Sequence, residues 1–202
     1  MTEKTDIKDL TLNQLGEWLD AHGIKPYRSG QIFKWIYLRQ TDDFSLMSDI
    51  GQTLRKLLTD HFSIGRLILK KTDISSDGSQ KFLYELSDGH HIETVLMPEK
   101  DHHTLCISSQ VGCAQACRFC LTGASGFVRN LTVSEIVEQV RDVQSRLENP
   151  ADLTNIVLMG MGEPLANYAS VIQAIRVFSD SNHGMGFSTR KITLSTAGLV
   201  PH

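Results

Sequence analysis

The chain has 202 residues, of which 41% are hydrophobic and 21% are charged, and these proportions are ordinary for a globular protein with a substantial core. No apolar run reaches the length of a membrane span, and the first residues lack the apolar core of a signal peptide. The net charge of −3 gives no general basic signature of a nucleic-acid-binding protein.

Residues 1–64 predict a helical domain. Thr11–Gln14 has the pattern of a capping box and predicts the start of a helix, Ser29 is expected to cap a second helix, and a third is expected at about 49–61. Residues 1–71 carry 11 Lys+Arg against 9 Asp+Glu, which permits RNA contact, although a solvated mixed surface explains the same numbers. The candidate RNA-contacting side chains are Lys25, Arg28, Lys34 and Arg39.

Residues 65–98 predict a small meander of antiparallel strands. The hydrophobic period changes towards two, and Asp-Gly pairs mark the turns between the strands. Pro98 closes the meander. The strands are expected at Leu67–Thr72, Lys81–Leu86 and His91–Met97.

Residues 99–202 alternate strand and helix. Either Ser134 or Thr132 is expected to cap the first helix. The β-α-β-α-β order predicts a parallel sheet with covering helices, as in a barrel or a doubly wound fold, with its chemistry at the carboxyl ends of the strands. Strands are expected at Thr104–Ser109, Thr154–Gly160 and Lys191–Ser195, and helices at Thr132–Leu147 and about Tyr168–Phe178.

Three of the four cysteines lie close together, at Cys113, Cys117 and Cys120, in a C-x-x-x-C-x-x-C pattern that follows a predicted strand. Thiolates are soft ligands that suit iron–sulfur clusters or zinc, and three of them leave one iron of a four-iron cube open for a small molecule. The alternative is a zinc site with His102 or His103 as fourth ligand, but zinc sites usually add a second cysteine pair well downstream. The spacing therefore favours a catalytic cluster. It does not resemble a disulfide framework, so the cytoplasm is the expected compartment.

Two further loops follow predicted strands. In Gly160-Met-Gly-Glu-Pro164 the glycines are expected to let a ligand approach the backbone, and Glu163 offers an acceptor for an ammonium group. Taken alone, this sequence is a plain turn more often than a ligand site. Ser195 offers a hydroxyl donor, or simply caps a turn at the end of its strand. The parallel topology predicts that these loops and the cysteine loop open on one rim.

Several stretches together resemble the dual-specificity adenine-C2 RNA methyltransferases of the radical S-adenosylmethionine superfamily. The resemblance implies a helical accessory domain that contacts RNA over residues 1–64, the meander over 65–98, and about half of a radical SAM partial (β/α) barrel over 99–202. The implied substrates are an adenine of 23S rRNA and an adenine of the tRNA anticodon loop. The stretches that carry the resemblance are Lys25–Tyr37, Glu93–Pro98, Thr104–Cys113, Gly126–Thr132 and Met159–Pro164.

The resemblance also implies a reaction. Adenine C2 lies between two ring nitrogens and does not attack an electrophilic methyl group, so the family uses a radical. The clustered cysteines would hold a [4Fe-4S] cluster that chelates S-adenosylmethionine, and an electron donor such as flavodoxin would trigger release of a 5′-deoxyadenosyl radical. In the family this radical takes a hydrogen from a methyl group carried on a cysteine near the C-terminus, and the carbon radical adds to C2.

The same resemblance assigns the other site residues. Cys106 matches the cysteine whose thiolate resolves the protein–RNA adduct by forming a disulfide. A cysteine in a strand is ordinarily a small buried residue, but the position of Cys106, seven residues before the cluster motif, favours the match. Glu93 matches the general base; otherwise it is a solvated strand carboxylate. Gly162, Glu163 and Ser195 match the cofactor contacts.

The resemblance breaks at one point. The family's barrel has about twice as many strand–helix units, and its methyl-carrying cysteine has no counterpart among the four cysteines here. We therefore expect a C-terminally truncated form that cannot complete methyl transfer alone, and a monomer without membrane association when full length. The alternatives are the C8-specific methyltransferases of the antibiotic-resistance type and a non-catalytic Fe–S or zinc RNA-binding module.

Overall fold

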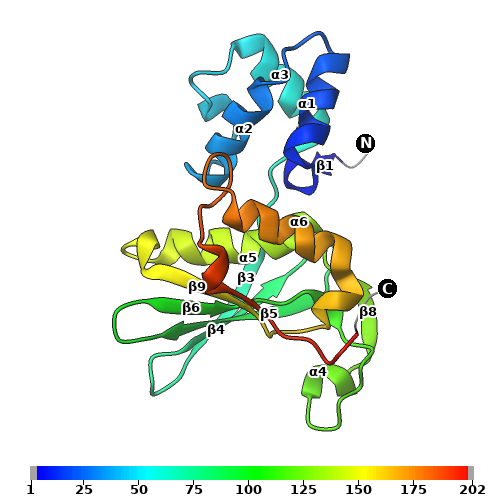
Figure 1. Ribbon diagram of the computed structural model, residues 1–202, viewed down its shortest axis with the longest axis vertical. Coiled ribbons are helices and arrows are strands. Elements are labelled where there is room, and N and C mark those ends of the chain that lie inside the picture. Colours follow the sequence, from blue (N-terminus) through cyan, green and yellow to red (C-terminus); the bar gives the residue numbers. More distant parts are fainter. Residues whose placement is uncertain (1–3, 200–202) are drawn as a thin grey trace.

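A computed structural model describes residues 4–199, so the outermost three residues of the predicted domains 1–64 and 99–202 lie outside the described part of the chain. Figure 1 shows a group of front helices above a sheet, with further helices between the two. The front group comprises α1 (Leu12–Ala21), α2 (Arg28–Tyr37) and α3 (Gln52–His61). Two short strands, β1 (Thr5–Asp6) and β2 (Phe62–Ser63), pair in parallel where the chain enters and leaves this group.

The front helices begin as local chemistry dictates, with one exception. The Thr11 hydroxyl accepts from Gln14 N at 3.2 Å and Gln14 Oε1 accepts from Thr11 N at 2.8 Å, which confirms the predicted capping box. The prediction that Ser29 caps α2 is wrong: the helix already begins at Arg28, and the Ser29 hydroxyl donates to Pro26 O at 2.8 Å. Since Ser29 is buried inside the first turn, its hydroxyl satisfies a nearby carbonyl instead of a free N–H.

One six-stranded sheet joins the meander to the parallel strands, in the order β10-β9-β6-β5-β4-β3. The first three strands of the chain in this sheet are antiparallel, and β6, β9 and β10 are parallel, as the alternation of strand and helix predicts. The strand bounds are β3 Ile68–Ile74, β4 Gln80–Glu85, β5 His91–Pro98, β6 His103–Cys106, β9 Leu153–Leu158 and β10 Ile192–Leu194.

Two helices cover one face of the sheet, α5 (Val133–Arg146) and α6 (Tyr168–Ser179), and both lie on the side of the front group (Figure 1). Thr132, rather than Ser134, caps α5 by accepting from Glu135 N at 3.2 Å. Alternate residues of β5 follow this layering, because Ile92 and Thr94 are buried beneath the helices and Glu93 is half-exposed on the other face. Neither α5 nor α6 covers the opposite face, on which Glu93 lies (Figure 1).

A short hairpin lies beside the main sheet and was not expected from the sequence. Its strands, β7 (Gln110–Gly112) and β8 (Phe127–Asn130), pair antiparallel and enclose the cysteine loop and the one-turn helix α4 (Leu121–Ala124). The predicted strand Thr104–Ser109 thus ends at Cys106, and the cysteines follow β7 instead. The remaining elements are the 3₁₀ turns η1 Ile7–Asp9, η2 Phe44–Leu46, η3 Pro150–Asp152, η4 Pro164–Asn167 and η5 Thr189–Lys191.

Buried charges join the front group to α5. Arg141 is fully buried, and its guanidinium donates to Ile36 O, Thr41 O and Glu138 Oε2 at 3.2, 3.2 and 2.6 Å. Glu138 also pairs with Lys8 at 3.1 Å. A buried ion is tolerated only when it is paired and hydrogen-bonded, so these contacts fix how α2 sits on α5.

Candidate functional site

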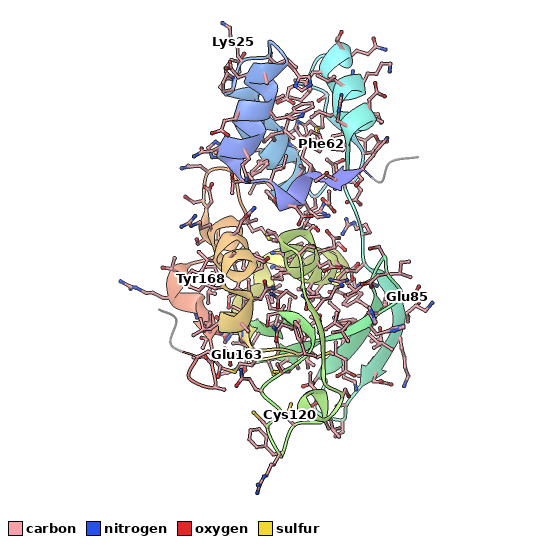
Figure 2. The ribbon with its side chains drawn as sticks, turned by 90° about the vertical axis from the view of Figure 1, so that its right-hand side faces the viewer. Lys25, Phe62, Glu85, Cys120, Glu163 and Tyr168 are labelled. Atoms are coloured by element: carbon pink, nitrogen blue, oxygen red, sulfur yellow. The ribbon has the colours of Figure 1, made fainter. Side chains whose placement is uncertain are left out.

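Three loops open at the carboxyl ends of the parallel strands, as the topology predicts. The segment after β6 leads into the cysteine loop, Gly160–Pro164 follows β9, and Ser195 follows β10 directly. Figure 2 shows Cys120 at the end of the molecule farthest from the front helices, with Glu163 between Cys120 and that group. The rim of the sheet therefore faces away from the front helices.

The cysteine loop is held at both ends by backbone contacts. Cys113 is buried, and its N–H donates to Gly126 O across the hairpin at 2.9 Å. Cys120 N donates to Cys117 O at 3.0 Å, which curls the loop before α4 begins. Gly112 must be glycine, because its φ is +72° and an added Cβ would meet Gly126 O at 1.9 Å. The chain thereby places Cys113 at the base of the loop, and Cys117 and Cys120 are partly exposed.

The donor set suits an iron–sulfur cluster. Hydrogen bonds from the N–H groups of Gly123 and Thr122 hold the pKa of the Cys120 thiol below its usual value, so the ligating thiolate is favoured. No set of three His, Cys, Asp or Glu side chains within residues 4–199 is gathered closely enough to hold a metal ion. The three thiols nevertheless lie on one loop and are soft donors, and the residues present fit such a cluster by their chemistry.

The structure explains why positions 160 and 162 are glycines, in a way that the sequence did not reveal. An added Cβ on Gly160 would lie 2.8 Å from Ile107 C and from Ser108 Oγ. An added Cβ on Gly162, whose φ is +104°, would lie 2.6 Å from Gln110 Cβ. The close approach that these glycines permit is thus the approach of the segment 107–110.

Glu163 ties two of the rim loops together. Its side chain is only 4% exposed. One carboxylate oxygen accepts from Leu165 N at 3.0 Å, and the other accepts from Ala197 N, two residues beyond Ser195, at 2.7 Å. The carboxylate predicted to receive an ammonium group therefore also holds the loop after β10 against the loop after β9.

Glu93 and Cys106 lie on the uncovered face of the sheet, on the neighbouring strands β5 and β6. The Glu93 carboxylate pairs with Lys81 Nζ at 2.8 Å, and the Glu93 side chain is 42% exposed. Burial raises the pKa of the Cys106 thiol, although a hydrogen bond from Met159 N–H acts in the opposite direction. Val95, two residues after Glu93, is the direct β-partner of Cys106, so the two candidate residues lie diagonally across the ladder.

A group of buried polar side chains beneath the rim escaped the sequence analysis. Gln139 on α5 accepts from Ser108 N at 2.8 Å and donates to Ser108 O at 3.0 Å. The Ser108 hydroxyl donates to Glu93 O at 2.6 Å and accepts from Met161 N at 2.9 Å. Asn167 donates to Ser109 O and to Leu131 O, both at 2.8 Å. No local pattern marks these residues, because the partners named here are all at least 15 positions away.

Comparison with known proteins identifies what this arrangement is similar to. Residues 5–64 match the ribosomal RNA large subunit methyltransferase N-terminal domain, and residues 107–202 match the radical SAM superfamily. The dual-specificity RNA methyltransferase RlmN of Desulfosudis oleivorans is 53% identical over 97% of the chain, and that of Syntrophobacter fumaroxidans is 49% identical over 98%. The chain belongs to the radical SAM RNA methyltransferase family of RlmN.

A solved structure supports the fold as well as the family. A radical SAM methyltransferase from Sphaerobacter thermophilus superposes with a TM-score of 0.87 at 43% identity, and the match covers 98% of the chain and 58% of that protein. The chain spans 53% and 58% of the lengths of the two RlmN relatives. Within the described residues, none of the helices combines the length and apolar character that crossing a membrane requires.

Proposed function

We propose that this chain provides the cluster-binding loop and part of the cofactor-binding rim of an enzyme that methylates C2 of adenine in 23S rRNA and in tRNA. The observation that carries the proposal is the meeting of three loops on one rim, two of them tied together by Glu163 Oε2 and Ala197 N. The names and identities of the RlmN relatives supply the substrate class.

The proposed roles follow from where each residue lies. Cys113, Cys117 and Cys120 would hold a [4Fe-4S] cluster, and Gly162, Glu163 and Ser195 would contact S-adenosylmethionine at the neighbouring loops. When bound, the cluster would supply one-electron chemistry and S-adenosylmethionine would supply the methyl group. Glu93, half-exposed on the sheet face opposite to α5 and α6, would accept the proton that leaves the adenine.

Cys106 would act as the thiolate that resolves the protein–RNA adduct. It lies on the same sheet face as Glu93, and all four cysteines of the chain are free thiols. Free thiols persist in the cytoplasm, which we propose as the location, with an electron donor such as flavodoxin and a monomeric full-length enzyme.

The front helices are proposed to contact RNA. Lys25, Lys34 and Arg39 are exposed, and the Arg39 guanidinium stacks over the Trp35 ring at 3.9 Å. Arg28 is half-buried and lies 5.2 Å from the centre of the Tyr27 ring. Cations and aromatic rings side by side suit phosphates and unstacked bases.

Anaerobic reconstitution with iron and sulfide tests the proposal. We expect a brown protein with about four irons per chain, whose electronic and EPR spectra change when S-adenosylmethionine is added. The variant Cys117→Ser should lose most of the iron. A colourless protein that binds one zinc would instead support the RNA-binding module.

The reaction itself is tested on RNA. In the full-length protein, mass spectrometry of digested 23S rRNA and tRNA should find the new methyl group on adenine C2, whereas C8 would identify the antibiotic-resistance type. We expect the chain of 202 residues alone to leave the RNA unmethylated. Appearance of C2-methyladenine with that chain would contradict this expectation.

A further inference from the structure

Gln110 occupies a position between the two loops to which the cofactor roles are assigned. It is the first residue of β7, three positions before Cys113, and its side chain is only 2% exposed. A buried primary amide carries two donors and one acceptor group that need partners. The partners of Gln110 therefore show what it holds.

Each end of the Gln110 amide binds a different loop. Gln110 Oε1 accepts from Glu163 N at 2.8 Å, in the loop after β9. Gln110 Nε2 donates to Asn130 Oδ1 at 2.7 Å, on the returning strand of the cysteine hairpin. The backbone adds a third link, since Gln110 N donates to Met161 O at 3.1 Å.

The Gln110 side chain packs directly against Gly162. The ideal Cβ of Gly162 would lie 2.6 Å from Gln110 Cβ and 2.7 Å from its Cγ, so the two residues touch and only glycine fits there. Glu163 in turn binds the loop after β10, because its carboxylate accepts from Ala197 N at 2.7 Å. A chain of hydrogen bonds thus runs from the cysteine hairpin through Gln110 and Glu163 to the third loop.

We propose that Gln110 is a positioning residue whose side-chain amide fixes the Gly160–Pro164 loop relative to the β7–β8 hairpin that carries the cluster cysteines. The inference rests on the proposed function for its purpose, since a ligand shared by both loops needs them at a set separation. It predicts that the two loops loosen together when the amide is removed.

Hydrogen exchange of the metal-free chain, read by mass spectrometry, tests this coupling directly. In Gln110→Leu, amides of residues 160–166 and 126–130 should both exchange about tenfold faster, while α1–α3 keep their protection. Gln52→Leu, the same change at an exposed position of α3, should alter neither segment. Unchanged protection, or loosening of one segment alone, would overturn the proposal.

Variants of Asn130 decide the question if Gln110→Leu fails to fold. Asn130 is exposed, so its replacement leaves the core intact. Asn130→Leu removes the acceptor of Gln110 Nε2, together with the donation from Asn130 Nδ2 to Ala166 O at 3.4 Å, and should loosen residues 160–166. Asn130→Asp lacks the same donor but keeps an acceptor oxygen for Gln110 Nε2, so residues 160–166 should exchange more slowly than in Asn130→Leu; equal exchange in the two variants would refute the role of Gln110.

Reconstitution separates positioning from mere structural support. Because the cysteines share one local loop, Gln110→Leu should take up as much iron as the parent chain. Its EPR response should nevertheless require about tenfold more S-adenosylmethionine. An unaltered titration, or loss of iron together with the response, would contradict positioning. If the parent chain takes up iron but shows no response, the proposed function fails, and the exchange comparison still decides the role of Gln110.

Discussion

Cys106 offers a test at the scale of a single residue. Burial raises the pKa of its thiol in the folded chain, so its thiolate appears only at a higher pH than that of an ordinary cysteine, whose pKa is about 8.5. The rate of alkylation by iodoacetamide at Cys106, followed by mass spectrometry, should therefore rise at higher pH in the folded chain than in the urea-unfolded chain. Coincident pH profiles for the two states would contradict this expectation.

Residues of the site differ in how well the sequence reveals them. Cys113, Cys117 and Cys120 could be proposed as cluster ligands because that role depends on local spacing, which is visible within eight residues of the sequence. Gln110 and Gln139 were not, because their roles depend on partners 20–53 and 31 positions away. A glutamine has no spacing rule, and only the folded chain shows whether its amide is buried and what it binds.

The hairpin that carries the cysteines is secured at the scale of elements by one arginine. Arg129 on β8 donates to Asp88 in the β4–β5 turn at 2.6 Å, and to both carboxylate oxygens of Glu135 at the start of α5 at 2.8 Å. The Arg129 guanidinium lowers the pKa of Asp88 to about 2. Arg129 therefore links β8 to the neighbouring start of α5 and to the β4–β5 turn, which lies 41 positions away in the sequence.

This contact predicts a specific acid dependence. A carboxyl whose folded pKa is lowered stabilises the fold above its unfolded pKa, about 3.9, and loses that contribution as the pH falls towards about 2. The difference in urea midpoint between the parent and Asp88→Asn should accordingly shrink from pH 5 to pH 2. The exposed Asp20→Asn on α1 serves as control. A pH-independent difference for Asp88→Asn would argue against the ion pair.

Elements with a clear period or cap were predicted, and those defined by pairing were not. The helices α1, α5 and α6 and the strands β3–β6, β9 and β10 follow from hydrophobic period and turn residues, within a few positions at each end. The β7–β8 hairpin did not, because Gln110–Gly112 is too short for a period of two and its partner strand lies beyond the cysteine loop. The start of α2 was misplaced because Ser29 resembles a cap.

At the scale of the whole molecule, Arg141 determines how the front helices are attached. Arg141→Met would leave the carbonyls of Ile36 and Thr41 without their buried donor and would remove one of the cations that pair with the buried Glu138 carboxylate. We expect the free energy of unfolding to fall by about 3 kcal/mol. Arg146→Met removes a pair with Asp142 on the same helix, but Arg146 is 41% exposed and the expected loss is below about 1 kcal/mol. Urea unfolding measures the loss in each variant. Equal losses would show that the buried ion contacts of Arg141 contribute no more to stability than the exposed pair of Arg146.

Helix α5 lies between the two parts of the molecule and is attached to both. Arg141 binds the carbonyls at the end of α2, while Gln139, on another face of the same helix, binds Ser108 beneath the rim. A helix attached in this way holds the front helices, with Arg28 and Lys34 of α2, at a fixed distance from the rim. If α2 contacts RNA as proposed, only nucleotides at that distance from α2 would arrive at the cysteine loop. The distance between the two parts of the molecule would then contribute to the selection of the target base.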